Sequence, residues 1–367
     1  MKIGILTYFF ASNYGAALQA WALTRLLREA GAQAELINYR CPALARPYAL
    51  DQIAAKGAGG YLLGVAGHLA RLPRRGKFSS FVETMPLSPS VTRRELPQLG
   101  REYDAFLTGS DQVWNCQVNG GDPTYLLDFV PPGVARLSFS ASFGFSHLPP
   151  GQGEFYRRHL QKFQNLSVRE ESGAKIIGQL LGRQAQVTLD PTLLLPGEAW
   201  EALAAGEPAD RAPYILVYQL GFSSAMLDFA RQLREKTGYP IQVVSLPLGR
   251  PLRARWRMDA GPAQWLGLIR DAEFVVTDSF HGTVFSILFH KRFFTETGGS
   301  IQKTSGRIGH LLSTLGLEGR ILSPGQLDSF SREIDYSGVE RRLAREREAS
   351  LRYLKKIAGL TQGGENS

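Results

Sequence analysis

Residues 275–285 read VVTDSFHGTVF, and this stretch decides the fold. Its pattern predicts a short apolar strand, a polar turn and then an apolar helix. In parallel α/β folds such a turn lies at the carboxyl end of the sheet, where the amides of the first helical turn have no partner within the helix. These amides and the helix dipole favour phosphate and carboxylate groups. The stretch therefore predicts an α/β domain with a site for a small anionic donor at this turn.

The order of strand followed by helix recurs along the chain. Residues 2–10 and 35–39 read as strands around a helix at 18–30, a βαβ unit whose turn lacks the GxGxxG dinucleotide fingerprint. Repetition of this order is typical of parallel α/β sheets. The remaining strand-like segments are 104–108, 137–144, 166–171, 187–192, 214–220 and 241–246.

Proline and glycine residues gather between Leu195 and Pro213, which predicts a linker at 196–212. We therefore expect two Rossmann-like α/β domains, residues 1–195 and 213–367, that face each other across a central cleft. A charged amphipathic pattern over 339–357 predicts a C-terminal closing helix.

The composition is that of a globular protein with anionic partners. The chain has 367 residues, of which 44% are hydrophobic and 20% charged, and this balance excludes a disordered chain. A net charge of +9 favours a phosphorylated donor, a lipid-linked phosphate, an acidic glycan or a membrane surface. No nucleic-acid-binding motif is present, so we expect no nucleic-acid partner. Cys41 and Cys116 are too few and too far apart for a disulfide framework or a cysteine zinc site.

The amino-terminal residues enter a strand pattern at once and lack the apolar core of a signal peptide. No apolar run is long enough to span a bilayer, so we expect a cytoplasmic protein. Residues 53–72 are compatible with a helix, and basic residues occur over 71–77. This segment is either an insertion that rests on anionic lipid at the inner membrane face or a surface helix with a solvated basic side.

His281 is the first candidate for chemistry, because it lies in a glycine-containing turn where ligands bind in α/β folds. Histidine side chains change charge near physiological pH, so His281 is suited to donate a proton or to hold a phosphate. Ser279, Gly282 and Thr283 are candidates to bind the same anion, although serine and threonine here also serve as plain helix caps. Asp278 is expected either to orient His281 or to cap the turn.

Two further strand exits in the first half carry polar residues. Asn13 and Gly15 follow the first strand, at a turn where ligands usually bind. Ser110 and Asp111 follow the strand at 104–108. A carboxylate at this place can activate an acceptor hydroxyl as a general base or bind sugar hydroxyls, or it can simply form an Asx-turn.

Arginine side chains are the candidate anion clamps. Arg169 follows a strand-like run and can hold a phosphate or carboxylate by two parallel hydrogen bonds; the alternative is a surface ion pair with Glu170 or Glu171. Arg307, at the start of a predicted helix, is a second candidate. The arginines of residues 250–257 are interpreted as a solvated loop or as a grip on a pyrophosphate-bearing acceptor.

The sequence predicts neither a metal site nor a serine hydrolase. It has no HExxH or DxD-type cluster, its histidines are scattered, and GxSxG is missing.

Six ordered segments resemble the polysaccharide pyruvyl transferase family. They lie between about residue 3 and about residue 315 and are more specific together than any one of them. The segments are NYGAALQA at 13–20, GSDQVWN at 109–115, SASFG at 140–144, SVRE at 167–170, LDPT at 189–192 and TDSFHGT at 277–283.

This resemblance implies a fold like that of the two-domain GT-B glycosyltransferases and a reaction without a metal or other cofactor. Family members transfer the carbon skeleton of phosphoenolpyruvate onto two hydroxyls of a sugar, forming a pyruvate ketal and releasing phosphate. By this likeness His281 contacts the donor and assists phosphate departure or protonation, and Arg169 and Arg307 bind its carboxylate or phosphate. The second domain is then the donor-binding domain. Asn13, Gly15, Ser110 and Asp111 would line the acceptor side, which belongs to the first domain.

Two other functions are compatible with the same residues. One is a GT-B glycosyltransferase that uses a nucleotide-sugar donor. The other is a glycan- or lipid-binding protein of the same fold without catalytic activity.

Overall fold

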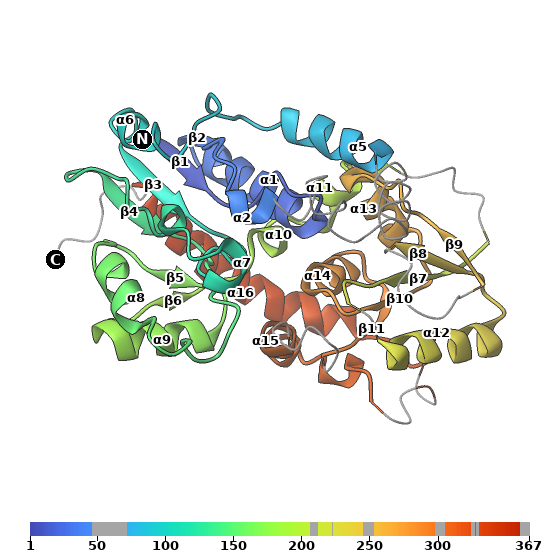
Figure 1. Ribbon diagram of the computed structural model, residues 1–367. Helices are drawn as coiled ribbons and strands as arrows, with labels where there is room; N and C mark the ends of the chain where they lie inside the picture. Colours follow the sequence, from blue (N-terminus) through green and yellow to red (C-terminus); the bar gives the residue numbers. More distant parts are fainter. Residues whose placement is uncertain are drawn as a thin grey trace, which may run out of the picture. The chain divides into compact units, whose positions relative to one another are not determined.

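The computed structural model of the chain consists of two compact units (Figure 1). It describes residues 1–45, 72–205, 212–221, 223–244, 253–297, 305–323, 327 and 330–359. Unit 1 comprises Met1–Gly67, Ser79–Leu194 and Arg345–Ser367, and unit 2 comprises His68–Phe78 and Leu195–Ala344.

Unit 1 is built on a parallel sheet of four strands in the order β2-β1-β3-β4. Their bounds are β1 Lys2–Leu6, β2 Gln33–Leu36, β3 Ala105–Thr108 and β4 Ala135–Ser138. A two-stranded parallel sheet of β5 Ser167–Val168 and β6 Gln186–Val187 follows, and bridges from Leu137 to Asn165 and from Ala141 to Val168 extend the β4 side toward it. The carboxyl ends of β1, β3, β4 and β5 therefore follow one another along one edge.

The helices of unit 1 follow its strands, as the βα pattern of the sequence predicted. The largest is α1, which is buried along most of its length and follows β1 directly. Trp114, Phe143 and Phe163 are buried in the core of this unit. The helices are α1 Tyr14–Glu29, α2 Pro42–Ala45, α6 Leu96–Leu99, α7 Cys116–Asn119, α8 Gly153–Leu160, α9 Glu171–Leu181 and α10 Pro191–Leu194, with a 3-10 turn η2 at Pro123–Leu126.

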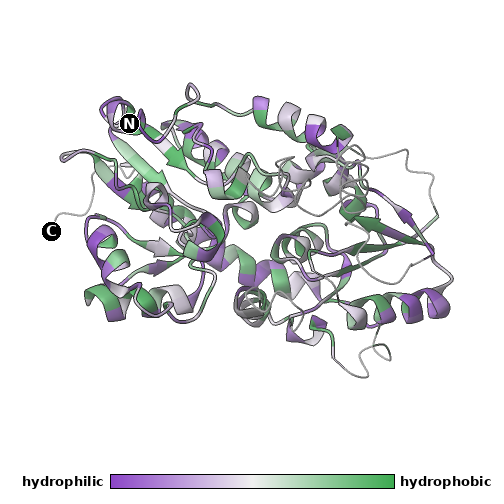
Figure 2. Ribbon diagram, viewed as in Figure 1, coloured by the Kyte–Doolittle hydropathy of each residue, from purple (hydrophilic) through white to green (hydrophobic). Residues whose placement is uncertain are grey.

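Unit 2 is built on a parallel sheet of five strands in the order β11-β10-β7-β8-β9. β10, Phe274–Thr277, is fully buried between β7 and β11, which explains why its sequence is apolar without alternation. Figure 2 shows the strands of this sheet coloured mainly as hydrophobic. The other strands are β7 Ile215–Tyr218, β8 Ile241–Val244, β9 Ala254–Trp256 and β11 Arg292–Thr295.

The helices of unit 2 include α14, the helix that follows β10 and was predicted from residues 275–285. The predicted arginine loop at 250–257 is wrong in part, because Arg255 lies in β9, where backbone pairing with β8 makes an edge strand. Arg250 lies outside the described residues. The helices are α11 Gly197–Glu201, α12 Ser224–Thr237, α13 Pro262–Arg270, α14 Phe280–Leu288 and α15 Ser305–Leu315, with a 3-10 turn η4 at Glu318–Arg320.

Two helices pass from one unit to the other. The predicted C-terminal helix is present as α16, Tyr336–Ile357, and the second half of it belongs to unit 1, where Arg347 Nε donates to the carbonyl of Leu193 at 2.6 Å. α5, Leu72–Glu83, also contains a unit boundary. The units therefore differ from the expected domains 1–195 and 213–367, since residues 345–367 group with unit 1.

The predicted helix at 53–72 lies outside the described residues except for its last position. Arg74, Arg75 and Lys77 of the basic segment lie on α5, where Lys77 Nζ forms an ion pair with Asp259 at 3.0 Å. In the part of the chain that the structure describes, no helix is both long enough and apolar enough to cross a membrane.

Candidate active site

The turn between β10 and α14 is held by short hydroxyl side chains. Thr277 Oγ1 donates to the carbonyl of Tyr218 at 2.7 Å and accepts the amide of Ser279 at 3.1 Å. Ser279 is the N-cap of α14, and its Oγ accepts the amide of Gly282 at 3.2 Å. The turn is thus fixed to the sheet, and the capping role weighed for Ser279 is the one that these contacts show.

Gly282 and Thr283 keep α14 close to the strands. An added Cβ at Gly282 would lie 2.5 Å from Thr277 Oγ1 and 3.0 Å from the Tyr218 ring, so only glycine fits without a shift. Thr283 is fully buried, and its Oγ1 donates to the carbonyl of Ser279 and lies 3.1 Å from Thr295 Oγ1. Both residues shape the turn through their packing against the strands. That they also contact a donor directly stays a prediction.

His281 and Arg307 both lie near the aromatic ring of Phe280. His281 is in the first turn of α14 and is 8% exposed, and its ring centroid is 5.2 Å from that of Phe280. Arg307, on α15, is 7% exposed, and its guanidinium carbon lies 5.9 Å from the same Phe280 centroid. The structure therefore brings together two residues that the sequence predicted separately, at the helix end that favours an anion.

Asp278 joins the turn to the neighbouring strand exit. Its carboxylate oxygens accept the amides of Leu220 at 2.7 Å and Gly221 at 2.8 Å. Burial raises the pKa of Asp278, the two amides lower it, and the negative charge of Glu296 raises it again. These contacts fix the α14 turn to the exit of β7, and the expected roles of Asp278 in orienting His281 or in capping the turn stay predictions.

In unit 1, Asn13 and Gly15 form the start of α1. Asn13 is its N-cap, and Oδ1 of Asn13 accepts the amide of Ala16 at 3.1 Å. Gly15 is buried in the first helical turn. Gln19, one turn further along, donates to Thr7 Oγ1 at 2.8 Å and to the carbonyl of Tyr8 at 3.1 Å, which fixes the helix to the end of β1.

Ser110 and Asp111 follow β3 at the same edge of the sheet. Ser110 is fully buried, and its Oγ donates to Asp190 Oδ2 at 2.9 Å. Asp111 is less buried and has a φ of 69°. Its Oδ1 accepts the backbone amide of Gln112 at 2.8 Å. Of this pair, only Asp111 presents a partly exposed side chain, so it is the one that can meet a ligand.

Arg169 is the centre of a buried group of carboxylates. Its Nη1 lies 2.7 Å from Asp190 Oδ2, its Nη2 3.5 Å from Asp111 Oδ1, and its Nε 4.0 Å from Glu170 Oε2. Burial alone would lower the pKa of Arg169, but the three carboxylates raise it above its ordinary value. Of the alternative, the ion pair with Glu170 is present, but it is buried and not at the surface, because the two side chains are 2% and 5% exposed.

Asp190 completes this cluster, which we call the Arg169 cluster (Asp111, Arg169, Glu170 and Asp190). Asp190 Oδ1 accepts the amide of Thr192 at 3.0 Å and its hydroxyl at 2.6 Å. In the sequence, Asp190 belongs to the segment LDPT at 189–192, whose local pattern predicts no role for it. Its partners lie 21 and 80 positions away, a separation that no local pattern reveals.

A family model described as polysaccharide pyruvyl transferase matches residues 13–296. The chain belongs to this family. The match spans β10, the α14 turn and all members of the Arg169 cluster, and so contains most of the side chains described above. No curated protein sequence matches the chain.

Solved structures with a similar fold are distant in sequence. A Staphylococcus aureus MnaA–UDP structure has a TM-score of 0.54 at 12% identity, covering 97% of this chain and 95% of that one. An α-glucosyltransferase bound to UDP and DNA has a TM-score of 0.52 at 9% identity, with the same coverages. UDP-GlcNAc 2-epimerase from Methanocaldococcus jannaschii has a TM-score of 0.51 at 11% identity and covers 97% and 99%. The predicted GT-B-like α/β class, with two parallel sheets and a long C-terminal helix, is confirmed.

In this pyruvyl transferase family member, two buried polar groups beside the α14 turn were missed by sequence reasoning. Gln219 follows β7 and is 6% exposed, and its Nε2 has no hydrogen-bond partner among the described residues. Glu296 follows β11, and its buried Oε2 likewise has no partner in the part of the chain that the structure describes. Such orphaned groups are rare and call for an explanation, a bound ligand among them. The signal was available, because both residues follow strands on either side of β10.

Among the described residues, no group of three or more histidine, cysteine, aspartate or glutamate side chains could hold a metal ion.

The candidate residues form two sets, one in each unit. The first contains Asn13, Gly15, Ser110, Asp111 and Arg169; the second contains Ser279, His281, Gly282, Thr283 and Arg307.

Proposed function

We propose that this chain transfers the pyruvyl group of phosphoenolpyruvate onto two hydroxyls of one sugar, forming a cyclic ketal and releasing phosphate. The sugar belongs to a cell-surface glycan or to its lipid-linked precursor, and the reaction takes place in the cytoplasm or at the inner membrane face. The observation that carries the proposal is that His281, in the first turn of α14, and Arg307 of α15 both lie near the Phe280 ring, in a member of this family.

The reaction needs an acid, a base and a fixed positive charge. His281 donates a proton to the methylene carbon of phosphoenolpyruvate, which leaves an oxocarbenium-like central carbon. A sugar hydroxyl attacks this carbon and gives its proton to a base, and the second hydroxyl then displaces phosphate, whose oxygen retains the C–O electron pair. The base then releases the first hydroxyl proton to solvent, His281 takes up one proton from solvent, and the second hydroxyl proton leaves with phosphate, so atoms and charge balance.

Unit 2 supplies the donor site in this proposal. The first turn of α14 and the Arg307 guanidinium favour the phosphate, since both place positive charge beside the same ring. Gln219 donates its orphaned Nε2–H to a donor oxygen, which would satisfy a group that is otherwise buried at a cost. His281 is then placed either to protonate the donor or to grip the leaving phosphate.

Unit 1 supplies the acceptor site. Asp111 is the proposed general base, and Asn13, Gly15 and Ser110 line the same sheet edge. Arg169 was predicted to bind the donor; its contacts to three carboxylates support a second task, the positioning of Asp111. In this position Arg169 engages one carboxylate oxygen of Asp111, Oδ1, and leaves Oδ2 for a hydroxyl of the sugar.

The direct test is mass spectrometry of candidate glycan precursors after incubation with phosphoenolpyruvate, together with a phosphate-release assay. We expect His281→Ala to lower turnover about a hundredfold or more, as is typical for loss of an acid catalyst. His147→Ala, at an exposed histidine of unit 1, is the matched control and should retain activity. Wild-type turnover of the His281→Ala variant would remove His281 from the chemistry.

A glycosyltransferase with a nucleotide-sugar donor is the second candidate, because all three of the similar structures described above hold UDP. Ligands that bind the folded state raise the melting temperature by simple linkage. We expect phosphoenolpyruvate to raise it and UDP to leave it unchanged; the opposite pattern would support the nucleotide-sugar function. A non-catalytic binding protein would release no phosphate with any acceptor.

A further inference from the structure

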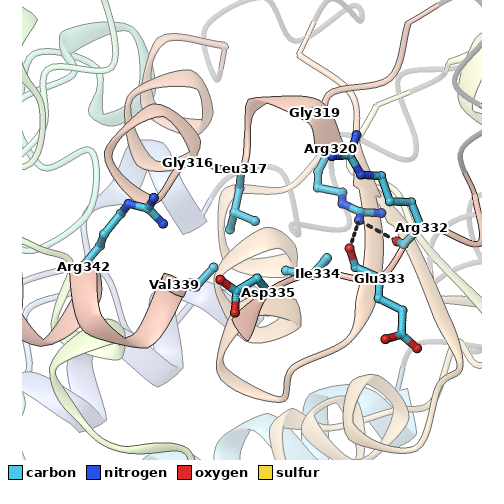
Figure 3. A pocket seen from close by; sticks show the side chains of 10 residues that line it. All are labelled: Gly316, Leu317, Gly319, Arg320, Arg332, Glu333, Ile334, Asp335, Val339 and Arg342. Carbon is cyan, nitrogen blue, oxygen red and sulfur yellow. Dashed lines mark hydrogen bonds between the residues drawn. The ribbon is translucent and has the colours of Figure 1, made fainter. Parts of the chain in front are cut away.

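A cavity of about 450 Å³ lies in unit 2, apart from the residues discussed above (Figure 3). It is formed by Gly316 and Leu317, which follow α15, by the 3-10 turn η4, by residues 332–335 and by the start of α16. Ligand pockets commonly have volumes of about 300–1,000 Å³, so its size suits a small organic molecule. Its lining is Gly316, Leu317, Gly319, Arg320, Arg332, Glu333, Ile334, Asp335, Val339 and Arg342.

Three arginines from different elements line this cavity. Figure 3 shows Arg320 and Arg332 on one side and Arg342 on the other. Arg320 is buried, and its Nη2 donates to the carbonyls of Arg332 at 2.7 Å and Glu333 at 3.2 Å. Burial lowers the pKa of Arg320, and the positive charges of Arg332 and Arg292 lower it further. Arg320 and Arg332 therefore raise each other's electrostatic energy, which an anion would relieve.

The carboxylates of the lining have other partners. Glu333 lies 3.3 Å from Arg292 Nη2 and is 85% exposed. Asp335 Oδ1 accepts the amide of Gly338 at 3.2 Å and the hydroxyl of Ser337, so it serves the start of α16. Within the described part of the chain, no carboxylate forms an ion pair with any of the three arginines that line the cavity.

Apolar side chains form the wall between the arginines. Leu317 and Val339 are buried, and Ile334 is half-buried. Figure 3 shows all three between Arg342 and the Arg320–Arg332 side. A bare inorganic ion would leave this wall in contact with water, whereas a molecule with an apolar portion would cover it.

We propose that this cavity binds a diphosphate or similar multivalent phosphate that carries an apolar substituent, with the phosphate oxygens on the three guanidinium groups and the substituent on Leu317, Ile334 and Val339. Guanidinium groups bind phosphate by paired, charge-assisted hydrogen bonds, which accounts for arginine instead of lysine here. The site is distinct from the donor site, because Gly316 lies nine residues beyond Arg307, about 14 Å along a helix.

Titration calorimetry of the full chain tests the proposal with two probes, inorganic pyrophosphate and geranyl diphosphate. We expect both to bind and geranyl diphosphate to bind more tightly, because it also covers the apolar wall. Arg342→Glu should weaken binding about tenfold or more, since it removes a charge-assisted contact and adds repulsion. Arg341→Glu, an exposed neighbour outside the lining, is the charge-matched control and should change affinity by less than about twofold.

Arg332→Glu is the second variant, in case loss of the Arg342 contact to the Leu315 carbonyl unfolds the chain. His281→Ala separates this site from the proposed donor site: affinity for geranyl diphosphate should survive it. Equal weakening by Arg341→Glu and Arg342→Glu would show attraction to a basic surface only and would overturn the proposal. Equal affinity for the two probes would overturn the assigned ligand class.

Discussion

Asp190 is the residue whose loss should destabilise unit 1 most directly. Its side chain is fully buried and holds Arg169 at 2.7 Å, Ser110 at 2.9 Å and the Thr192 hydroxyl at 2.6 Å. Asp190→Ala removes the nearest counter-charge of the Arg169 guanidinium, itself 2% exposed; among the described residues the ion pairs with Asp111 at 3.5 Å and Glu170 at 4.0 Å are longer. The perturbation therefore strands a buried positive charge and two buried hydroxyl groups.

The expected cost is about 3–5 kcal/mol, the range found when one partner of a buried ion pair is removed. For a unit of this size, such a loss lowers the melting temperature by roughly 6–20 °C. Glu348→Ala is the matched control, because Glu348 pairs with Arg352 on α16 at 3.3 Å while both side chains are more than 70% exposed. Exposed pairs contribute about 0–1 kcal/mol, so this control should melt almost as the wild type does.

Differential scanning calorimetry measures both variants, and a double variant decides the cause. Arg169→Met with Asp190→Leu removes both charges and fills the space with apolar groups, a replacement that is often neutral for buried pairs. We expect it to be more stable than Asp190→Ala alone. If the double variant loses as much stability as its two substitutions lose when each is made alone, added together, the reasoning is refuted, because the stranded charge is then not the cause. A loss below about 1 kcal/mol for Asp190→Ala would refute it as well.

Three further predictions concern the α14 turn. Gly282→Ala should destabilise unit 2 by about 1–3 kcal/mol in denaturant unfolding, because its Cβ would overlap the buried Oγ1 of Thr277, and an unchanged midpoint would contradict this. Ser279→Ala should cost about 1 kcal/mol in the same assay through loss of the cap. Asp278 holds its proton to higher pH in the folded state than in the unfolded state, so its contribution to stability falls as pH rises from 3.8 toward its raised pKa. Asp278→Asn should remove this decline from the profile of melting temperature against pH, and parallel profiles would exclude it.

The parts of the fold that depend on local pattern were predictable from the sequence. Residues 274–277 are apolar at every position except the last because a central parallel strand is covered on both faces, and this alone identified β10. The residues at its exit follow from the βα rule, which placed His281 at the start of a helix. The same rule was not applied at the ends of β7 and β11, where Gln219 and Glu296 lie.

Partners distant in sequence were not predictable. Arg169 has acidic neighbours at 170 and 171, and local reasoning paired it with them, although its shortest ion pair is with Asp190. The unit boundary inside α16 was hidden for a related reason. An amphipathic pattern shows that a helix has a buried face, but it carries no information about which unit that face packs against. Hence the C-terminal residues 345–367 group with unit 1, although they follow unit 2 in the chain.

The two interpretations weighed for the helix-start residues, cap or ligand site, are compatible with each other. Ser279 and Asn13 each accept one amide, from Gly282 and Ala16, three residues along their helices. Helix geometry leaves the other amides of a first turn without a partner within the helix, so a cap fixes the turn while preserving its capacity for an anion. The difference between the two helix starts then comes from neighbouring charge. The α14 turn has Arg307 beside it, which suits an anionic donor, whereas the edge of the α1 sheet carries the carboxylate-rich Arg169 cluster, which suits the hydroxyls of a sugar.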